Sequence, residues 1–162
     1  MEAKVVWHKR LTFTGSADTG FQLPLGTMPE VGGDNDGFQP MELIAIGLAG
    51  CTAMDVMSIM LKKRQVVTAF EVQVHAKRAP EHPKVFTQAT IEYIFSGHAI
   101  DEAAVVRSIE LSTIRYCPAQ AMFNKVFPIE LVYSIYEDQE GGGRKLVKSG
   151  IYSPSAALET PG

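Results

Sequence analysis

Alternation of apolar and polar residues predicts a chain rich in β-strands. In the segment AFEVQVHAKRA, residues 69–79, Phe70, Val72 and Val74 share one face while polar residues occupy the other. This period of two is typical of a half-buried strand. Alternation, or enrichment in β-branched and aromatic residues, predicts further strands at residues 3–14, 21–25, 85–97 and 129–137. Because short turns separate several of them, the pattern predicts an antiparallel sheet.

Two regions between the strands show helical signals. The first begins at Pro40, a residue that suits the first position of a helix, and it carries Glu42 in its first turn. We expect this helix to reach about Arg64. The second region is residues 101–116, and a short helix is expected to start at Cys117. The order of strands, long helix, hairpin, helix pair and strand indicates an α+β fold.

Length and composition fit a single domain. The chain has 162 residues, of which 46% are apolar and 20% charged, and its net charge is −3. A nucleic-acid partner would require a basic face, so we expect none. We expect one domain over residues 1–138 and an irregular tail over residues 139–162. The N-terminal residues lack the apolar core of a signal peptide, which predicts a cytoplasmic protein with reduced cysteines.

The segment LIAIGLAGCTAMDVMSIML, residues 43–61, is nearly free of charge and approaches the length of a membrane span. Asp55 lies within it, and an acidic side chain inside a bilayer costs at least ~2.5 kcal/mol. Gly47 and Gly50 lower its hydropathy further. We therefore expect a helix that is buried on most sides and no contact with a membrane.

Two cysteines are the candidate reactive groups, although a buried cysteine is often only a small hydrophobic residue. Cys117 precedes Pro118, and a thiol at a helix N-terminus has its thiolate favoured by unpaired N–H groups. Cys51 has small neighbours in the sequence, which let a ligand or another backbone approach. Asp55 lies one turn after Cys51, and its negative charge would raise the pKa of the Cys51 thiol. A reactive Cys51 therefore requires a cation from elsewhere in the fold.

The spacing of potential ligands argues against a metal site. Cys51 and Cys117 are far apart in the sequence, neither belongs to a C-x-x-C motif, and the 4 histidines show no recognisable ligand spacing. We therefore expect no structural zinc. A Cys–His hydrolase stays open in principle, yet nothing in the sequence brings a histidine near either cysteine.

Two separate segments, GGDNDGFQPMELIAIGLAGCTAMDVMSIMLKKR and RSIELSTIRYCPAQAM, resemble the OsmC/Ohr family of osmotically inducible and organic hydroperoxide resistance proteins. In that family a glycine-rich loop and a proline lead into a long helix with the first cysteine, and the second cysteine follows another helix. The resemblance covers residues 3–137 and is strongest to the OsmC-like branch. It implies an OsmC-like fold, in which a curved antiparallel β-sheet wraps around two long central helices of an intertwined homodimer.

The resemblance also implies a function. Enzymes of the family reduce organic hydroperoxides by thiol chemistry, so Cys51 would be the peroxidatic cysteine and Cys117 the resolving one, without a cofactor. A dithiol such as a dihydrolipoyl group would reduce the resulting disulfide. An apolar wall would receive the peroxide, and it would consist of Met41, Ile44, Leu48 and Met54.

The Ohr pattern holds the peroxidatic thiolate with an Arg–Glu pair, and this chain departs from that pattern. The family's Glu directly follows the proline, whereas Met41 takes that position here and Glu42 comes one residue later. One residue turns a helix by ~100°, so Glu42 is a candidate either for catalysis or for stabilising the first turn only. Arg10 in the first strand is the candidate arginine. Lys9 is its neighbour, and strand alternation would direct only one of them to the site.

Two alternatives to a peroxidase stay open. The same dimer could bind a small apolar or electrophilic ligand, or sense redox state, with the cysteines as sensors or bystanders. The chain could also have a purely structural role, in which both cysteines are packed and unreactive. A contact between the two cysteines would favour the peroxidase, because a disulfide holds its Cβ atoms within about 4.5 Å of each other.

Overall fold

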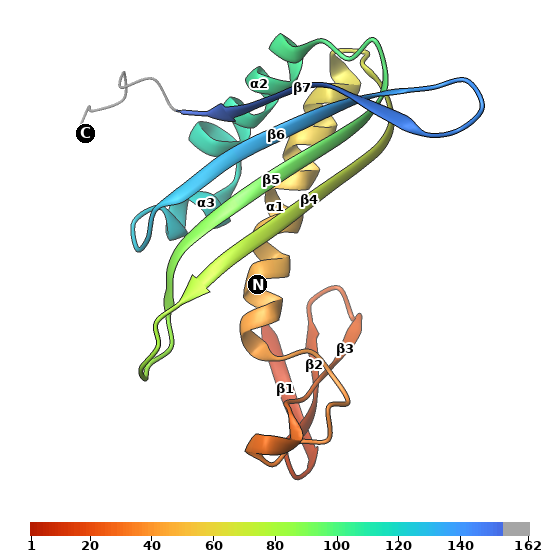
Figure 1. Cartoon of the computed structure of the whole chain (residues 1–162). Helices are drawn as coiled ribbons and strands as arrows, with labels where there is room; N and C mark the ends of the chain where they lie inside the picture. Colours follow the sequence, from red (N-terminus) through yellow and green to blue (C-terminus); the bar gives the residue numbers. More distant parts are fainter. Residues whose placement is uncertain (154–162) are drawn as a thin grey trace. The chain divides into compact units, whose positions relative to one another are not determined.

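The computed structural model describes residues 1–153, and residues 154–162 lie outside the description. The chain divides into two compact units, Met1–Ile46 and the remainder from Gly47 onward. Helix α1, Pro40–Lys62, contributes residues to both. Figure 1 shows a small unit of strands at the N-terminus and a larger unit of helices and strands after it, which confirms the predicted α+β class.

The first unit holds a three-stranded antiparallel sheet in the order β1 Ala3–Lys9, β2 Thr12–Ala17 and β3 Gln22–Leu25. The strand predicted over residues 21–25 is confirmed, but the single strand predicted over residues 3–14 is wrong. The chain turns at Arg10, whose φ of 44° is left-handed, and the Trp7 indole N–H donates to the Arg10 carbonyl at 2.8 Å. No glycine or proline marks this turn, so the sequence pattern gave no sign of it.

Helix α1 begins at Pro40, as predicted, after a short 3₁₀ helix at Pro29–Val31. The Glu42 carboxylate accepts a hydrogen bond from the Gln39 backbone N–H at 2.9 Å, which is half of a capping box around the first turn. The helix ends at Lys62, slightly before the predicted end. Four residues of α1 are buried at four-residue spacing, which marks one face of the helix, namely Leu48, Thr52, Val56 and Met60.

The second unit contains a four-stranded sheet in the order β4 Val66–Arg78, β5 Phe86–His98, β6 Ile129–Asp138 and β7 Arg144–Tyr152. The prediction of a purely antiparallel sheet is wrong, because β5 and β6 are parallel, with Tyr93 opposite Tyr133. Residues 99–128 connect these two strands through helices. A connection of that length can return the chain to the same end of the sheet, whereas a short turn cannot.

Strand β7 corrects the expected irregular tail over residues 139–162. Residues 144–152 pair with β6 in antiparallel register, with Val132 opposite Ile151. The glycines at 141–143 have φ values of 95°, 88° and 112°, so the GGG run forms the hairpin turn that leads into β7. The final part of the expected tail, residues 154–162, lies outside the described residues.

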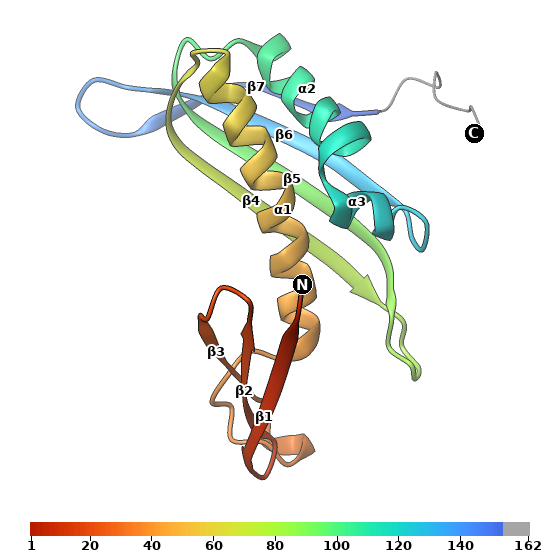
Figure 2. The ribbon, with the colours of Figure 1, turned by 180° about the vertical axis from the view of Figure 1, so that it is seen from behind.

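The crossover contains α2 Glu102–Leu111, the π-helical turn η2 Ser112–Tyr116, and α3 Pro118–Phe123. Asp101, the first residue of the region predicted to be helical, caps α2, because its carboxylate accepts the Ala103 N–H at 3.0 Å. Figure 2 shows α2 and the part of α1 in this unit on the same face of the four-stranded sheet. Their buried side chains meet those of the sheet in one core, whose largest members include Val56, Met60, Ile91, Tyr93, Phe95, Val105, Ile109, Leu131 and Ile135.

With 23 residues, α1 is the one long helix within residues 1–153. The predicted fold has two long central helices, and in an intertwined homodimer the second would belong to the partner chain. The pair of central helices and the homodimer therefore stay predictions.

Candidate active site at the paired cysteines

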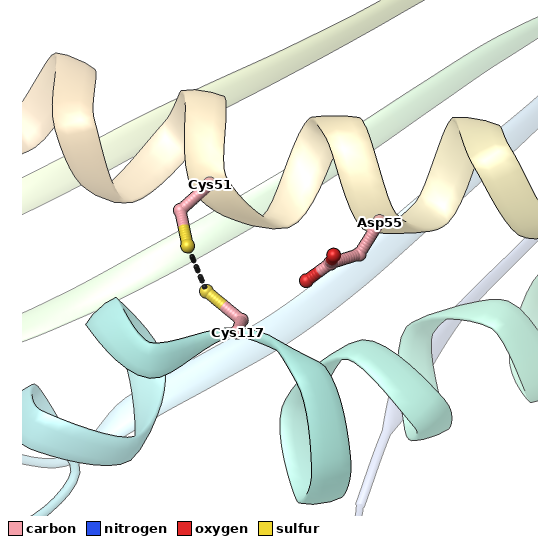
Figure 3. Close-up of side chains that lie close together, drawn as sticks. All are labelled: Cys51, Asp55 and Cys117. Carbon is pink, nitrogen blue, oxygen red and sulfur yellow. Dashed lines mark hydrogen bonds between the residues drawn. The ribbon is translucent and has the colours of Figure 1, made fainter.

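Cys51 on α1 and Cys117, which follows η2, lie in contact. Their Sγ atoms are 3.0 Å apart, and the Cys117 thiol donates toward the Cys51 sulfur (Figure 3). A disulfide bond would measure ~2.05 Å, so both cysteines are free thiols in this structure. The contact that would favour a peroxidase is therefore present, although the two cysteines are separated by 66 positions in the chain.

The π-helical turn η2 sets the position of Cys117. The Cys117 N–H donates to the Ser112 carbonyl at 2.8 Å, with the wider spacing that defines a π-helix. Such turns occur often at functional sites. Pro118 then starts α3, with Cys117 as its N-cap in extended conformation. The Cys117 sulfur accepts the Gln120 backbone N–H at 3.4 Å, which holds the thiol at the start of α3.

The prediction that Cys117 favours its thiolate is wrong. The residue is 2% exposed, and burial raises the pKa of its thiol well above the ordinary value. The hydrogen bond with Cys51 raises this pKa further. The backbone N–H groups of Gln120 and Ala119 act in the opposite direction, but they do not offset the loss of hydration. Cys117 is therefore a protonated thiol at neutral pH.

Cys51 is the more accessible of the two sulfurs, because it is half-buried whereas Cys117 is buried. Asp55 follows Cys51 by one helical turn, and Figure 3 shows its carboxylate extending from α1 toward the segment that carries Cys117. A carboxylate oxygen and the two sulfurs all lie within 4.8 Å of one another. The prediction that Cys51 and Asp55 face the same side of the helix is confirmed.

These three atoms form a possible metal-ligand set of two sulfurs and one oxygen. Tetrahedral zinc with Zn–S bonds of ~2.3 Å would separate two thiolate sulfurs by roughly 3.8 Å. The observed separation is 3.0 Å, and the cluster offers three ligand residues where a structural zinc site takes about four. The arrangement suits two thiols that react with each other better than it suits a metal centre.

A buried hydrogen-bond network adjoins the cysteine pair. The Thr52 hydroxyl oxygen lies 2.7 Å from that of Tyr93 and 2.9 Å from that of Ser112. Ser112 also donates to the Asp55 carboxylate at 3.2 Å. The side-chain amide of Gln120 donates to the Tyr93 hydroxyl at 3.1 Å. The network thus connects α1, β5, η2 and α3.

The direction of this network follows from the single proton on each hydroxyl. Because Ser112 gives its proton to Asp55, it must accept the proton of Thr52. Thr52 in turn accepts from Tyr93, which accepts from Gln120. Burial raises the pKa of Tyr93 to about 12, so its hydroxyl keeps the proton that this order requires. Every hydroxyl in this series of hydrogen bonds therefore donates in the direction of Asp55, whose carboxylate is the final acceptor.

A hollow of about 330 Å³ opens beside this carboxylate, lined by Asp55, Ser58, Ile59, Lys62, Leu111 and Tyr116. It gives water or a small polar ligand access to Asp55. The guanidinium of Arg115, two residues before Cys117, lies over the Tyr116 ring at 5.5 Å from its centre.

The predicted pair of Arg10 and Glu42 is not formed within the described residues. Arg10 lies in a turn, and its guanidinium forms an ion pair with Asp34. The Lys9 ammonium is 3.5 Å from the same carboxylate, so both basic neighbours face one partner, contrary to the alternation expected for a strand. Glu42 caps the first turn of α1 through Gln39. That bond matches its predicted structural role.

The residues predicted to form an apolar wall differ in exposure. Leu48 is 3% exposed and belongs to the core, so it is not free to line a substrate site, which corrects that prediction. Met54 is 76% exposed and Ile44 is 39% exposed. Met41 is half-buried. The last three remain candidates for contact with a peroxide.

Comparison with known proteins identifies the family. The profile of the OsmC-like protein family matches residues 33–132. Protein YhfA of Escherichia coli strain K12 is 36% identical over 135 residues, which span 83% of this chain and 98% of that protein.

Two solved structures share the fold. An OsmC-like protein from Mycoplasma pneumoniae has a TM-score of 0.71 at 18% identity, over 83% of this chain and 95% of that chain. An organic hydroperoxide resistance protein OsmC from Legionella pneumophila has a TM-score of 0.59 at 15% identity, over 83% of this chain and 94% of that chain. The profile match and the likeness to YhfA confirm the resemblance seen in the sequence, and this chain belongs to the OsmC-like protein family.

Proposed function

We propose that the chain is a thiol-dependent peroxidase that reduces organic hydroperoxides in defence against oxidative stress. The observation that carries the proposal is the separation of 3.0 Å between the Cys51 and Cys117 sulfurs. Two thiols at this distance can form a disulfide with little movement of the backbone. Membership of the OsmC-like family supports the proposal, and one structural neighbour is named an organic hydroperoxide resistance protein.

Exposure favours Cys51 as the peroxidatic residue. Its sulfur is half-buried and can meet a substrate, whereas Cys117 is buried and its pKa is raised. The thiolate is the nucleophile in cysteine chemistry, so the more accessible sulfur is the better candidate for the first attack. Cys117 is then the resolving residue, because it touches Cys51 and needs no access from solvent.

The proposed cycle balances without a cofactor. The Cys51 thiolate attacks the O–O bond of the hydroperoxide, forms an S–O bond and releases an alkoxide, which takes a proton and leaves as the alcohol. The sulfur of Cys117 then attacks the sulfur of the Cys51 sulfenic acid. An S–S bond forms, the S–O bond breaks, and water leaves. An external dithiol such as a dihydrolipoyl group reduces the disulfide and is itself oxidised.

We also infer that the chain acts as a cytoplasmic homodimer. By length and composition, helix α1 is apolar enough to cross a membrane. Only 22% of its most apolar 18-residue stretch is buried within the chain, so much of its apolar surface is uncovered. A second copy that covers this surface removes the need for a membrane, which Asp55 disfavours. The first unit also carries an apolar hollow of about 420 Å³, lined by Val5, Leu11, Phe13, Leu25, Gly26, Thr27 and Pro40.

The test is a count of free thiols in the reduced protein before and after one equivalent of cumene hydroperoxide. We expect the wild-type chain to lose both thiols and to form an internal disulfide. The Cys51→Ser variant should lose none, because Cys117 is buried and protonated. The Cys117→Ser variant should stop at a sulfenic acid on Cys51, which a 1,3-diketone reagent traps. A wild-type protein that keeps both thiols would refute the peroxidase.

A second candidate is a redox-sensing or ligand-binding protein on the same fold. The observation that favours it is that Arg10 pairs with Asp34 and Glu42 caps α1, so each of these two side chains already has a structural partner. The thiol count is therefore followed with excess peroxide and excess dithiol. A peroxidase consumes many equivalents of peroxide per chain, whereas a sensor is oxidised and turns over slowly or not at all.

A further inference from the structure

The resolving step of the proposed cycle requires a proton acceptor. Cys117 is 2% exposed and protonated, so its thiol must lose a proton as its sulfur attacks oxidised Cys51. Bulk water has little access to this sulfur. The acceptor must therefore be a group of the protein that lies close to both sulfurs, together with any water that reaches that group.

Asp55 meets this requirement by position. Its carboxylate oxygen lies within 4.8 Å of both sulfurs, and Figure 3 shows the carboxylate extending toward the Cys117 segment. The Ser112 hydroxyl donates to it at 3.2 Å and fixes its orientation. Ser112 also accepts the Cys117 backbone N–H through its carbonyl at 2.8 Å, so one residue positions both the carboxylate and the cysteine.

The hydrogen-bond network gives this carboxylate the role of acceptor. The hydrogen bonds run in one direction, from Gln120 through Tyr93, Thr52 and Ser112, and the last of them is accepted by Asp55. A carboxylate oxygen has about two lone-pair sites, and the whole group has about four. One bond from Ser112 therefore leaves capacity on Asp55 for the proton of a thiol or for a water in the adjoining hollow.

We propose that Asp55 is the general base of the resolving step, accepting the proton of the Cys117 thiol while the S–S bond forms. This inference rests on the proposed peroxidase function and assigns a residue to its second step. The proton leaves Cys117 for Asp55, and the same carboxylate then returns it to the departing hydroxide of the sulfenic acid, so that water is released. No free Cys117 thiolate forms, and the carboxylate is regenerated.

The same negative charge has the opposite effect on the first step. The attacking group of Cys51 is negatively charged and like charges repel, so Asp55 is not expected to assist the attack on peroxide. Neutralising Asp55 should therefore leave the rate of the attack on peroxide unchanged or raise it, while it lowers the rate at which the Cys51–Cys117 disulfide forms. A general structural disturbance would slow both steps, so the two rates distinguish the two explanations.

The experiment uses the full-length chain with Asp55→Asn, whose amide has nearly the same size and can still accept the Ser112 hydrogen bond through its oxygen. Reduced protein is mixed with cumene hydroperoxide and quenched at intervals. Intact mass separates the sulfenic acid, which has gained one oxygen, from the disulfide, which has lost two hydrogens. We expect the sulfenic acid to form at the wild-type rate or faster and the disulfide to form on the order of 10²-fold more slowly.

Two further variants are measured alongside. Asp55→Glu keeps a carboxylate, and it should restore much of the lost rate of resolution. Glu71→Gln removes a negative charge on exposed β4, far from the cysteines in the sequence, and both rates should match the wild type. A disulfide rate in Asp55→Asn equal to that of the wild type, or an equal slowing of both steps, overturns the inference alone. A wild-type chain that does not react with peroxide overturns the proposed function together with it.

Discussion

Tyr93 is the residue on which the buried network depends most. It is fully buried on β5, and its hydroxyl bonds both Thr52 and Gln120. A hydroxyl in this environment is costly to leave unpaired, and so are its partners when it is removed. The Oε1 atom of Gln120, an acceptor, is already buried without a hydrogen-bond partner among residues 1–153, so loss of the Tyr93 hydroxyl would leave both polar atoms of this amide unpaired.

We predict that Tyr93→Phe lowers the free energy of unfolding by roughly 1–3 kcal/mol below pH 10, since Thr52 and Gln120 each lose a partner. Burial raises the pKa of Tyr93 from 10.0 to about 12 in the folded chain. The folded state therefore holds this proton more tightly than the unfolded state. The stability that the shift contributes is complete below pH 10 and is lost as the pH rises toward 12.

Urea unfolding across this range checks the prediction. The wild-type chain should lose about 2 kcal/mol more than Tyr93→Phe between pH 10 and pH 12, so the stability difference between them narrows. The variant is the matched control for the other tyrosines, whose ionisation affects both proteins alike. A stability difference that stays constant with pH would contradict the assigned shift.

At the scale of single residues, the sequence predicted the two cysteines and the shared helix face of Cys51 and Asp55. It did not predict Thr52, Ser112 or Gln120 as network members. A lone hydroxyl or amide carries no local signal, because its role depends on which distant residue meets it. The thiolate predicted for Cys117 failed for a similar reason, since burial is decided by the fold.

At the scale of elements, the sequence predicted correctly those features that depend on interactions between neighbouring residues. Pro40 and Asp101 marked helix starts correctly, because capping involves only neighbouring residues. The prediction of a single strand over residues 3–14 was wrong because Arg10 adopts a left-handed conformation, which is not expected for an arginine. The tail was wrong because three consecutive glycines serve equally well in a hairpin turn and in an irregular segment.

Gly97 on β5 is an element-scale constraint that the sequence did not reveal. A Cβ atom at this position would lie 2.0 Å from the Val66 carbonyl oxygen of β4, which is backbone and has little freedom to move. We predict that Gly97→Ala lowers the free energy of unfolding by about 1–3 kcal/mol or more. Gln88→Ala on the exposed side of the same strand is the control and should change it by less than about 0.5 kcal/mol.

Urea unfolding of the two variants gives the comparison. The steric argument fails if Gly97→Ala is as stable as Gln88→Ala. A destabilised but folded Gly97→Ala chain would indicate that β4 shifts to make room for the methyl group.

At the scale of the whole molecule, the proposed dimer makes a direct prediction. Met54 on α1 is 76% exposed in the single chain, which is unusual for an apolar residue in the middle of a long apolar helix. Light scattering should give a mass near twice the 17.7 kDa of one chain. Met54→Arg should shift this toward the single-chain mass, because a charge would be buried without a partner.

Met54→Leu, which preserves the apolar contact, should remain dimeric. A wild-type mass of one chain would refute the homodimer. Unchanged dimers of Met54→Arg would mean that the interface lies elsewhere on the chain.

The sequence by itself determined the α+β class, the starts of the helices, most strand positions and, through two cysteine motifs, the family. These features depend on periodicity, capping and residue type over short stretches of chain. Only the tertiary structure decided the parallel pairing of β5 with β6, the pairing of Arg10 with Asp34, and the network that ends on Asp55. Each of these depends on contacts between residues far apart in the sequence, where burial and partner geometry outweigh any local preference.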